Sequence, residues 1–163
     1  MILYEEILRE FQKQKVKYII VGGIAFNLLG GSRNTLDLDM LVEMTDDNLR
    51  RVVTILKKAG FHVKQPVDPI MIAIQAIRED WIKNKNMKAL NFYKNDRSYQ
   101  EVDILIDSPV DYRLASKDAS KVRAGKLTLP VISVKRLIQM KKATGRDMDR
   151  RDVAQLKTIH RIR

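Results

Sequence analysis

Hydrophobic residues follow two different spacings along the chain, which indicates that helices and strands are mixed. Apolar residues repeat at helical spacing over residues 2–14, where Ile7, Leu8 and Phe11 fall on one side. The same reasoning, together with capping residues, predicts helices over residues 24–29, 46–59, 69–84, 134–143 and 148–159. Short apolar or alternating runs predict strands over residues 17–21, 36–42, 88–93 and 102–106, and a hairpin of 121–123 with 126–131.

This order of elements predicts an α/β (α+β) fold, with a mixed β-sheet flanked by helices and a helical C-terminal part. The length of 163 residues fits one domain. We expect a core over residues 1–110, with a basic hairpin and helical part over residues 111–163 packed on the same domain.

Charge is distributed unevenly along the chain. Residues 1–110 carry 16 Lys and Arg against 15 Asp and Glu, whereas residues 111–163 carry 15 against 5, and these two parts account for the net charge of +11. A basic final third favours an anionic partner, either a nucleic acid, the phosphates of a nucleotide or an acidic protein. The alternative is a set of solvated basic helices.

The composition excludes several classes of function. The chain has no cysteine, which rules out disulfide scaffolds, thiolate zinc sites and cysteine nucleophiles. The apolar runs are too short to span a bilayer, so no membrane association is expected. The N-terminus lacks the basic region of a signal peptide, and a cytoplasmic location is therefore expected.

An acidic pair, Asp37 and Asp39, is the most informative local feature. In a strand these side chains point to one face, roughly 6.6 Å apart at about 3.3 Å per residue. Because neighbouring carboxylates repel each other, a compensating charge is needed, and Mg²⁺ prefers such oxygen ligands. The alternative is an exposed strand face paired with lysines.

Further polar residues extend this candidate site. Gly22-Gly23 follows a predicted strand, where glycines allow a backbone to approach a phosphate closely. Arg33 and Thr35 alternate in register with Asp37 and can reach the same side. In the strand over residues 102–106, Asp103 offers a third carboxylate for a two-metal site of phosphoryl transfer, and Glu101 on its face is a substitute.

Lys141 occupies an unusual position on its predicted helix. At 100° per residue it falls in the middle of the apolar stripe that contains Leu137 and Ile138. A lysine there either extends past the last helical turn toward solvent or points at an anion such as a phosphate. The nearby acids Asp149 and Asp152 are interpreted as structural partners of Arg146.

These motifs resemble the nucleotidyltransferase superfamily of the DNA polymerase β type. The resemblance rests on Gly22-Gly23, the segment 37–40 and the segment 102–104, in that order and spacing. With Arg33, Thr35 and the helices of the C-terminal part, the chain is similar to the small prokaryotic branch that includes abortive-infection and toxin–antitoxin nucleotidyltransferases. One departure is that the classical enzymes often have Gly-Ser where this chain has Gly22-Gly23, so a serine hydroxyl for the triphosphate is missing.

The resemblance implies that Asp37 and Asp39 bind two Mg²⁺ ions, that Asp103 binds the catalytic ion and helps to activate the acceptor hydroxyl, and that Gly22 and Gly23 hold the triphosphate. The implied reaction transfers a nucleoside monophosphate from a nucleoside triphosphate (ATP among them) to a hydroxyl, with release of pyrophosphate. The basic final third favours RNA, including tRNA, as a toxin-like target, with a cognate antitoxin protein as partner. Alternatives are an antibiotic or other small acceptor, and a non-catalytic nucleotide-binding or protein-interaction module.

Overall fold

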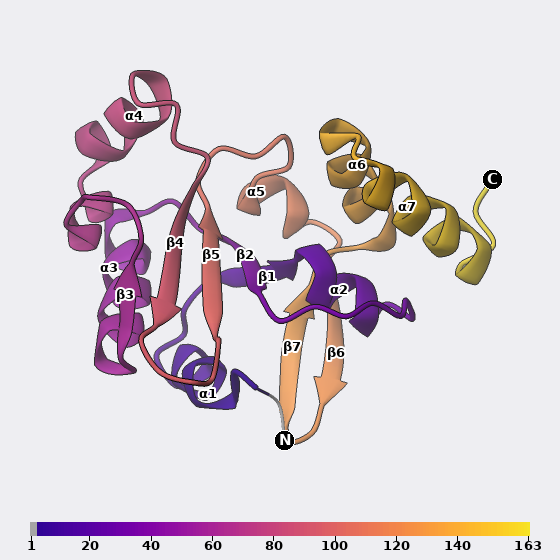
Figure 1. The fold of residues 1–163 in the computed structure, drawn as a ribbon, viewed down its shortest axis with the longest axis horizontal. Coiled ribbons are helices and arrows are strands. Elements are labelled where there is room, and N and C mark those ends of the chain that lie inside the picture. Colours follow the sequence, from indigo (N-terminus) through magenta and orange to yellow (C-terminus); the bar gives the residue numbers. More distant parts are fainter. Residues whose placement is uncertain (1–2) are drawn as a thin grey trace.

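The computed structural model describes residues 3–163, and seven strands of this range form one sheet (Figure 1). The strands are β1 Tyr18–Val21, β2 Leu38–Val42, β3 Phe61–Val63, β4 Ala89–Lys94, β5 Glu101–Leu105, β6 Ser120–Ala124 and β7 Leu127–Val131. The helices are α1 Glu5–Lys13, α2 Gly22–Leu28, α3 Asp46–Lys58, α4 Gln75–Lys83, α5 Tyr112–Ala115, α6 Val134–Thr144 and α7 Asp147–Ile159, with a 3₁₀ helix η1 over Pro69–Ala73.

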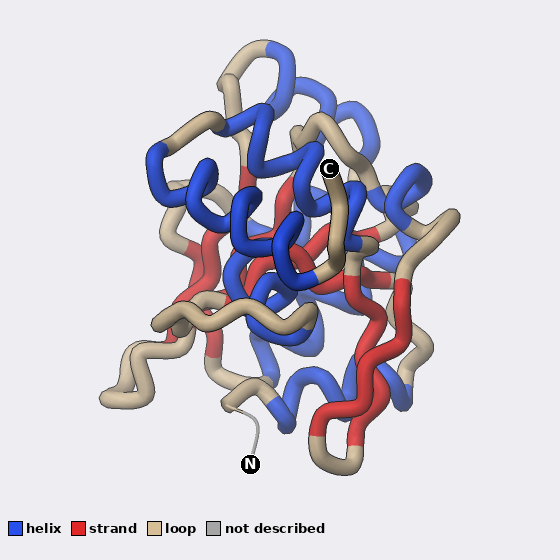
Figure 2. The backbone as a smooth tube through the Cα atoms, turned by 90° about the vertical axis from the view of Figure 1, so that its right-hand side faces the viewer, coloured by secondary structure: helices blue, strands red, loops and turns tan. Residues whose placement is uncertain are grey.

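The strand order β3-β4-β5-β2-β1-β7-β6 makes the sheet mixed, which confirms the predicted fold class. Strand β2 runs parallel to β5, and β1 runs parallel to β7, while the other neighbours are antiparallel. The C-terminal hairpin β6–β7 therefore extends the same sheet that contains β1, β2 and β5. In Figures 1 and 2 this hairpin lies in the lower part of the molecule.

Alternation along the central strands separates an apolar face from a polar one. Ile20, Met40, Ile104 and Leu90 form one row across four strands, and each is at most 2% exposed. Burial of such a side chain contributes about 1.5–3 kcal/mol to stability. Since neighbours in a strand point to opposite faces, the next row presents its side chains on the other side of the sheet. That row contains the acidic residues described below.

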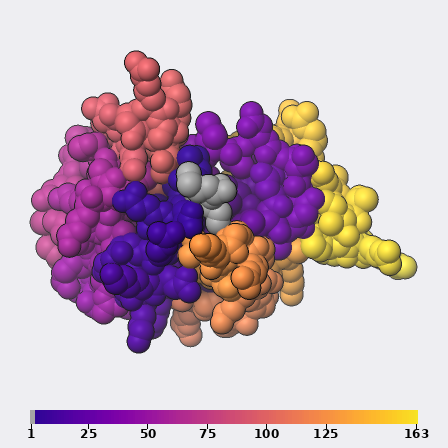
Figure 3. Space-filling model, turned by 90° about the horizontal axis from the view of Figure 1, so that it is seen from below, coloured from indigo at the N-terminus to yellow at the C-terminus, as the bar shows by residue number. Residues whose placement is uncertain are grey.

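Helices cover the sheet and close one of its ends. Helix α3 packs against α1 and η1, whereas α2 packs on β1 and β2. Helices α6 and α7 lie side by side at the upper right of Figure 1 and across the upper half of Figure 2. The end of α7 projects beyond the body of the molecule in the view from below (Figure 3). This arrangement places α6 beside the strand ends where the chain enters α2.

Capping residues define several helix ends as the sequence predicts. The Thr45 hydroxyl accepts a hydrogen bond from the backbone of Asn48 at the start of α3, and Ser133 does the same for Arg136 at the start of α6. Gly145 ends α6 with φ of 61°, the left-handed conformation that glycine adopts without strain.

The helix predicted over residues 69–84 is wrong as a single element. The chain forms η1, breaks at the extended residue Ile74, and continues as α4. Ile72 and Ala73 lie in the core at this break, whereas Ile74 is 45% exposed. The buried Arg78 guanidinium donates to the Ile72 carbonyl oxygen at 3.2 Å and so satisfies an acceptor at the break.

Two short elements, β3 and α5, have no counterpart among the predicted ones. They contain three and four residues, too few for a periodic pattern to emerge. Within residues 3–163, no helix combines the length and the hydrophobicity that a bilayer span requires.

Candidate active site

The acidic residues occupy one row across the centre of the sheet. Asp39 of β2 lies opposite Asp103 of β5 on one side and opposite Val21 of β1 on the other. Asn91 of β4 extends the row beyond Asp103. Because β2 and β5 are parallel and in this register, two carboxylates that are 64 positions apart in the sequence meet directly.

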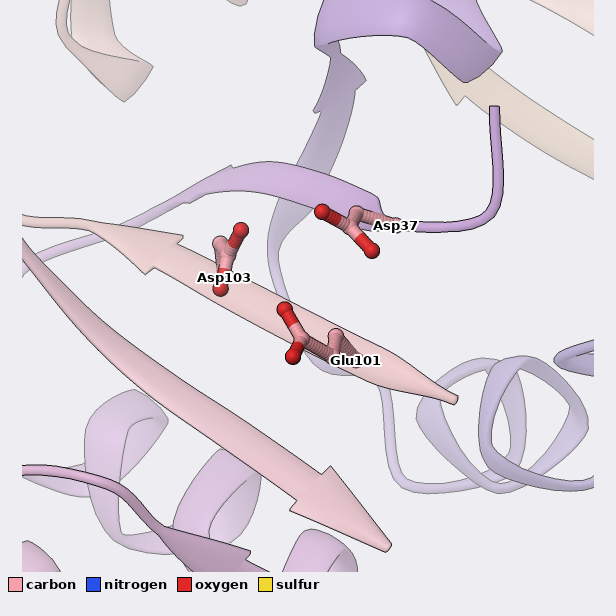
Figure 4. Close-up of side chains that lie close together, drawn as sticks. All are labelled: Asp37, Glu101 and Asp103. Atoms are coloured by element: carbon pink, nitrogen blue, oxygen red, sulfur yellow. The ribbon is translucent and has the colours of Figure 1, made fainter. Parts of the chain in front are cut away.

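Asp37 reaches the same place from outside the strand. It lies immediately before β2, which begins at Leu38, so the expectation that Asp37 is a strand residue is wrong. Carboxylate oxygens of Asp37, Glu101 and Asp103 nevertheless lie within 4.8 Å of one another (Figure 4). In Figure 4 Glu101 and Asp103 project from β5, and Asp37 faces them from the incoming chain. Four carboxylates, including Asp39, thus crowd into one small region.

This crowding changes the protonation of two of the acids. Burial raises the pKa of Asp39 to about 8, and the charge of Asp103 and a hydrogen bond with it act in the same direction. Burial, followed by the charges of Glu101 and Asp103, also raises the pKa of Asp37. Raised carboxyl pKa values mean that negative charge in this cluster lacks compensation. The donor set of closely spaced carboxylate oxygens fits hard divalent cations such as Mg²⁺.

The glycine pair packs directly against the acids. Gly22 has φ of +69°, and a Cβ atom at this position would lie 2.1 Å from Oδ2 of Asp39. A Cβ atom on Gly23 would lie 2.7 Å from Oγ1 of Thr35. The absence of side chains at both positions therefore lets the turn between β1 and α2 touch the candidate site, as the sequence suggested.

A cavity of about 390 Å³ joins these parts. Its lining contains every residue that the sequence proposes for the site: Gly22, Gly23, Arg33, Thr35, Asp37, Asp39, Asp103 and Lys141. Glu101 does not line this cavity but a neighbouring one. The remaining lining residues are Val21, Leu105, Leu137, Met140, Thr144, Arg146 and Asp149. The sheet supplies the acids, and α6 together with the start of α7 supplies cations on the facing wall.

Lys141 is buried at the wall of this cavity, with 6% of its surface exposed. Its ammonium lies 2.8 Å from Oδ2 of Asp152 and 5.5 Å from the ring centre of Phe26. Arg33 holds the same oxygen of Asp152 at 2.7 Å. A carboxylate of α7 thus fixes two cations in place, a role for Asp152 that differs from the predicted partnership with Arg146.

Arg146 pairs instead with Asp149, as the sequence predicts for that residue. Its Nε donates to Oδ2 of Asp149 at 2.8 Å, and the Thr144 hydroxyl donates to the same oxygen at 2.7 Å. Burial acts to raise the pKa of Asp149, but these hydrogen bonds outweigh it and lower that pKa below its ordinary value. The guanidinium of Arg146 stays partly in solvent, with 70% of its side chain exposed.

Sequence reasoning missed two groups that hold the acids in position. Asn91 donates to Oδ1 of Asp103 at 2.6 Å and accepts a bond of 2.5 Å from Gln65. The period-two pattern of β4 places Asn91 opposite the apolar face, which is a signal that could have been used.

The second missed group is the buried hydroxyl of Tyr4. It donates to the carbonyl oxygen of Leu36, next to Asp37, and accepts from the backbone N–H of Glu101 at 3.1 Å. Burial raises the pKa of Tyr4 to about 12, so the hydroxyl keeps its proton at neutral pH. No local pattern in the sequence indicates this contact, because its partners are 32 and 97 residues away.

Comparison with known proteins gives one family and several similar folds. The family described as aminoglycoside-2''-adenylyltransferase matches residues 4–157. Among solved structures, the lincomycin-bound lincosamide antibiotic adenylyltransferase LnuA aligns with a TM-score of 0.64 and 17% identity, over 96% of each chain. ANT(2'')-Ia in complex with adenylyl-2''-tobramycin aligns with a TM-score of 0.61 and 14% identity, over 96% of this chain and 86% of that one.

A putative nucleotidyltransferase from Thermotoga maritima aligns with a TM-score of 0.59 and 17% identity, over 98% of this chain and 89% of that one. The comparison with curated proteins gave no match. At these identities the structural matches establish that the chain shares the nucleotidyltransferase fold.

Proposed function

The chain belongs to the aminoglycoside-2''-adenylyltransferase family, and from this premise we propose that it transfers AMP from ATP to a hydroxyl group of a small molecule and releases pyrophosphate. The observation that carries the proposal is the meeting of Asp39 and Asp103 in one row, with Gly22 packed against Asp39. Acids alone are common on protein surfaces. Acids that lie beside a glycine turn and share a cavity with the buried ammonium of Lys141 and the guanidinium of Arg33 suit a triphosphate with its metal ions.

The nucleotide is assigned to the cavity of about 390 Å³. The backbone at Gly22 and Gly23 approaches the triphosphate, and Arg33 and Lys141 contribute side-chain donors. Arg146 adds a partly exposed cation at the rim. These groups stabilise negative charge on the phosphates and on the departing pyrophosphate.

Asp37, Asp39 and Asp103 would hold the divalent cations, with Glu101 close enough to contribute. Two Mg²⁺ ions bound there would offset the charge of the triphosphate and help to align the reacting groups. Asp103 is the proposed acceptor of the proton from the attacking hydroxyl. Its orientation is fixed by the bond from Asn91.

A second cavity, of about 410 Å³, is the proposed place for the acceptor. It shares Asp37 with the first cavity, so a hydroxyl bound there reaches the acids from a side other than that of the triphosphate. This relation suits in-line attack, in which the attacking and leaving oxygens lie on opposite sides of the phosphorus.

The lining of the second cavity favours a small polar or cationic acceptor. It consists of Asp37, Lys64, Tyr93, Lys94, Asp96, Tyr99, Gln100 and Glu101. The Lys64 ammonium is paired with Glu101, and that of Lys94 lies 5.3 Å from the ring centre of Phe61. Three carboxylates and two tyrosine rings suit amino and sugar groups better than a phosphate backbone. The solved structures of the same fold include antibiotic adenylyltransferases, which also favours a small-molecule acceptor.

RNA remains the second candidate acceptor, because the exposed side of α7 is basic. Arg150 and Arg151 lie on it, and Lys157 near its end adds a further charge. A toxin-like action on RNA or tRNA, with an antitoxin partner, would use this surface. Binding of RNA would weaken steeply as salt concentration rises, whereas binding of an uncharged small acceptor would not.

The proposal is tested by label transfer. The protein is incubated with α-labelled ATP and Mg²⁺, together with aminoglycosides, lincosamides or total cellular RNA in separate reactions. Label is expected in a small-molecule product, and Asp39→Ala is expected to yield none while it folds like the parent. Label in RNA alone would establish the second candidate. ATP binding without a labelled product across these acceptors would favour a non-catalytic module.

A further inference from the structure

Gly23 lacks a side chain for a reason other than backbone conformation. The φ angle of Gly23 is not positive, so an L-residue could adopt its backbone angles. A Cβ atom there would instead lie 2.7 Å from Oγ1 and 3.0 Å from Cβ of Thr35. Rotation of the Thr35 side chain would not remove the second contact. Thr35 therefore occupies the space that a side chain at position 23 would need.

The Thr35 hydroxyl is free to bind a ligand. Thr35 lies in the extended segment that leads to β2, two residues from Arg33 and two from Asp37, and all three line the cavity of about 390 Å³. No hydrogen bond of this hydroxyl is recorded to any residue in the described range 3–163. By contrast, the other hydroxyl of this lining, that of Thr144, is bonded to Asp149.

The surroundings of Thr35 indicate what that ligand would be. The cavity that Thr35 lines contains both the acids that fit divalent cations and two side-chain cations, Arg33 and the buried ammonium of Lys141. A ligand that binds between metal ions and these side-chain cations must carry negative charge and accept hydrogen bonds. The phosphates of a nucleotide have both properties. A hydroxyl donor at this point adds a directional bond to an otherwise electrostatic site.

We propose that the Thr35 hydroxyl donates a hydrogen bond to the triphosphate, and that Thr35 together with Gly23 provides from the strand side the hydroxyl missing from the glycine turn. The inference rests on the proposed function, since it assumes that a triphosphate binds in this cavity. It also implies exchange: a serine at position 23 is compatible with the site only when residue 35 is glycine, because alanine would keep the Cβ atom of the 3.0 Å contact.

The test measures the affinity for a non-hydrolysable ATP analogue with Mg²⁺ by titration calorimetry, with melting curves to establish that each variant folds. Thr35→Val keeps the shape of the side chain and removes the donor, so affinity is expected to fall about 10-fold or more. Thr35→Ser keeps the donor and is expected to stay within about threefold of the parent. Gly23→Ser combined with Thr35→Gly, which removes the Cβ atom of residue 35 as well, is expected to bind more tightly than Thr35→Gly alone.

The outcomes separate the inference from the function on which it rests. If the parent protein does not bind the analogue, the proposed function fails. If the parent binds it and Thr35→Val binds equally well, the inference alone is overturned. If the double variant binds no better than Thr35→Gly although its melting curve shows that it folds, the exchange of the hydroxyl between the two positions is overturned.

Discussion

Asp39 and Asp103 lie directly opposite each other in the parallel pairing of β2 and β5, where like charges destabilise a sheet. The apolar residues on either side of them, Met40 and Ile104 among them, are almost fully buried and hold this register. A slip by one residue would move those apolar side chains out of the core. Core packing therefore forces the two carboxylates together, and the cost is offset by protonation or by bound cations.

The pH dependence of stability follows from this relationship. The pKa of Asp39 is about 8 in the folded protein, above its ordinary value of 3.8, so the folded state binds more protons than the unfolded state between about pH 4 and pH 8. Stability of the metal-free protein should fall as pH rises through this window. Asp39→Asn, which cannot ionise, should raise the melting temperature at pH 8 by a few degrees or more.

The control for this prediction is Asp107→Asn. Asp107 is exposed and lies just beyond β5, paired with Lys88 on the surface. The Asp107→Asn variant should leave the pH dependence of stability unchanged, since exposed ion pairs contribute at most about 1 kcal/mol. Equal pH dependence for the parent and Asp39→Asn, measured with a chelator present, would contradict the assignment of the raised pKa to Asp39.

Gly22→Ala should abolish nucleotide binding in addition to straining the turn between β1 and α2. The new methyl group would overlap Asp39, in addition to the cost of about 1 kcal/mol for a positive φ. Gly60→Ala is the matched control, because Gly60 has φ of +92° and no atom within 4 Å of an added Cβ. Calorimetry with ATP analogue and Mg²⁺ should show lost binding only for Gly22→Ala. Equal binding by both variants would show that Gly22 does not contact the nucleotide.

Asp152→Ala should destabilise the protein by about 3 kcal/mol, because it leaves the ammonium of Lys141 buried without its closest carboxylate. Asp147→Ala, five residues earlier in α7, removes an exposed partner of Arg150 and should change stability by at most about 0.5 kcal/mol. Urea unfolding measures both. Similar values for the two variants would show that the Lys141 pair is not buried in solution.

Tyr4→Phe should weaken the positioning of the acidic residues, while the phenyl ring still fills the same place in the core. It removes the hydroxyl that joins Leu36 to Glu101, and should cost about 1–2 kcal/mol and weaken the binding of Mn²⁺. Tyr18 is also buried but has no hydroxyl hydrogen bond recorded within residues 3–163, so Tyr18→Phe should leave Mn²⁺ affinity unchanged. Equal Mn²⁺ affinity of Tyr4→Phe and the parent would exclude this positioning role.

The sequence predicts β2 and β5 well because their segments alternate apolar with acidic residues. That pattern identifies Asp39 and Asp103 as residues that face away from the core. It does not tell which strands are neighbours, so the direct meeting of these two acids is visible only in the sheet. The glycine turn is likewise predicted as a turn, while its fit against Asp39 depends on the packing of β1 against β2.

Interactions between distant segments account for what the sequence did not predict. Lys141 is correctly identified as a cation in an apolar stripe, but its partner Asp152 lies on the following helix and was assigned to Arg146 instead. The break at Ile74 depends on packing of η1 against α3, which overrides a continuous helical tendency.

We propose that Asp37, Asp39 and Asp103 bind divalent cations together with a nucleoside triphosphate. The most direct measurement counts bound Mn²⁺ by electron paramagnetic resonance, with and without a non-hydrolysable ATP analogue. We predict two Mn²⁺ ions per chain with the analogue, loss of this binding in Asp39→Asn, and full binding in Asp107→Asn. The same Mn²⁺ count in Asp39→Asn as in the parent protein, or no bound Mn²⁺ in the parent, would contradict the assignment of these aspartates as metal ligands.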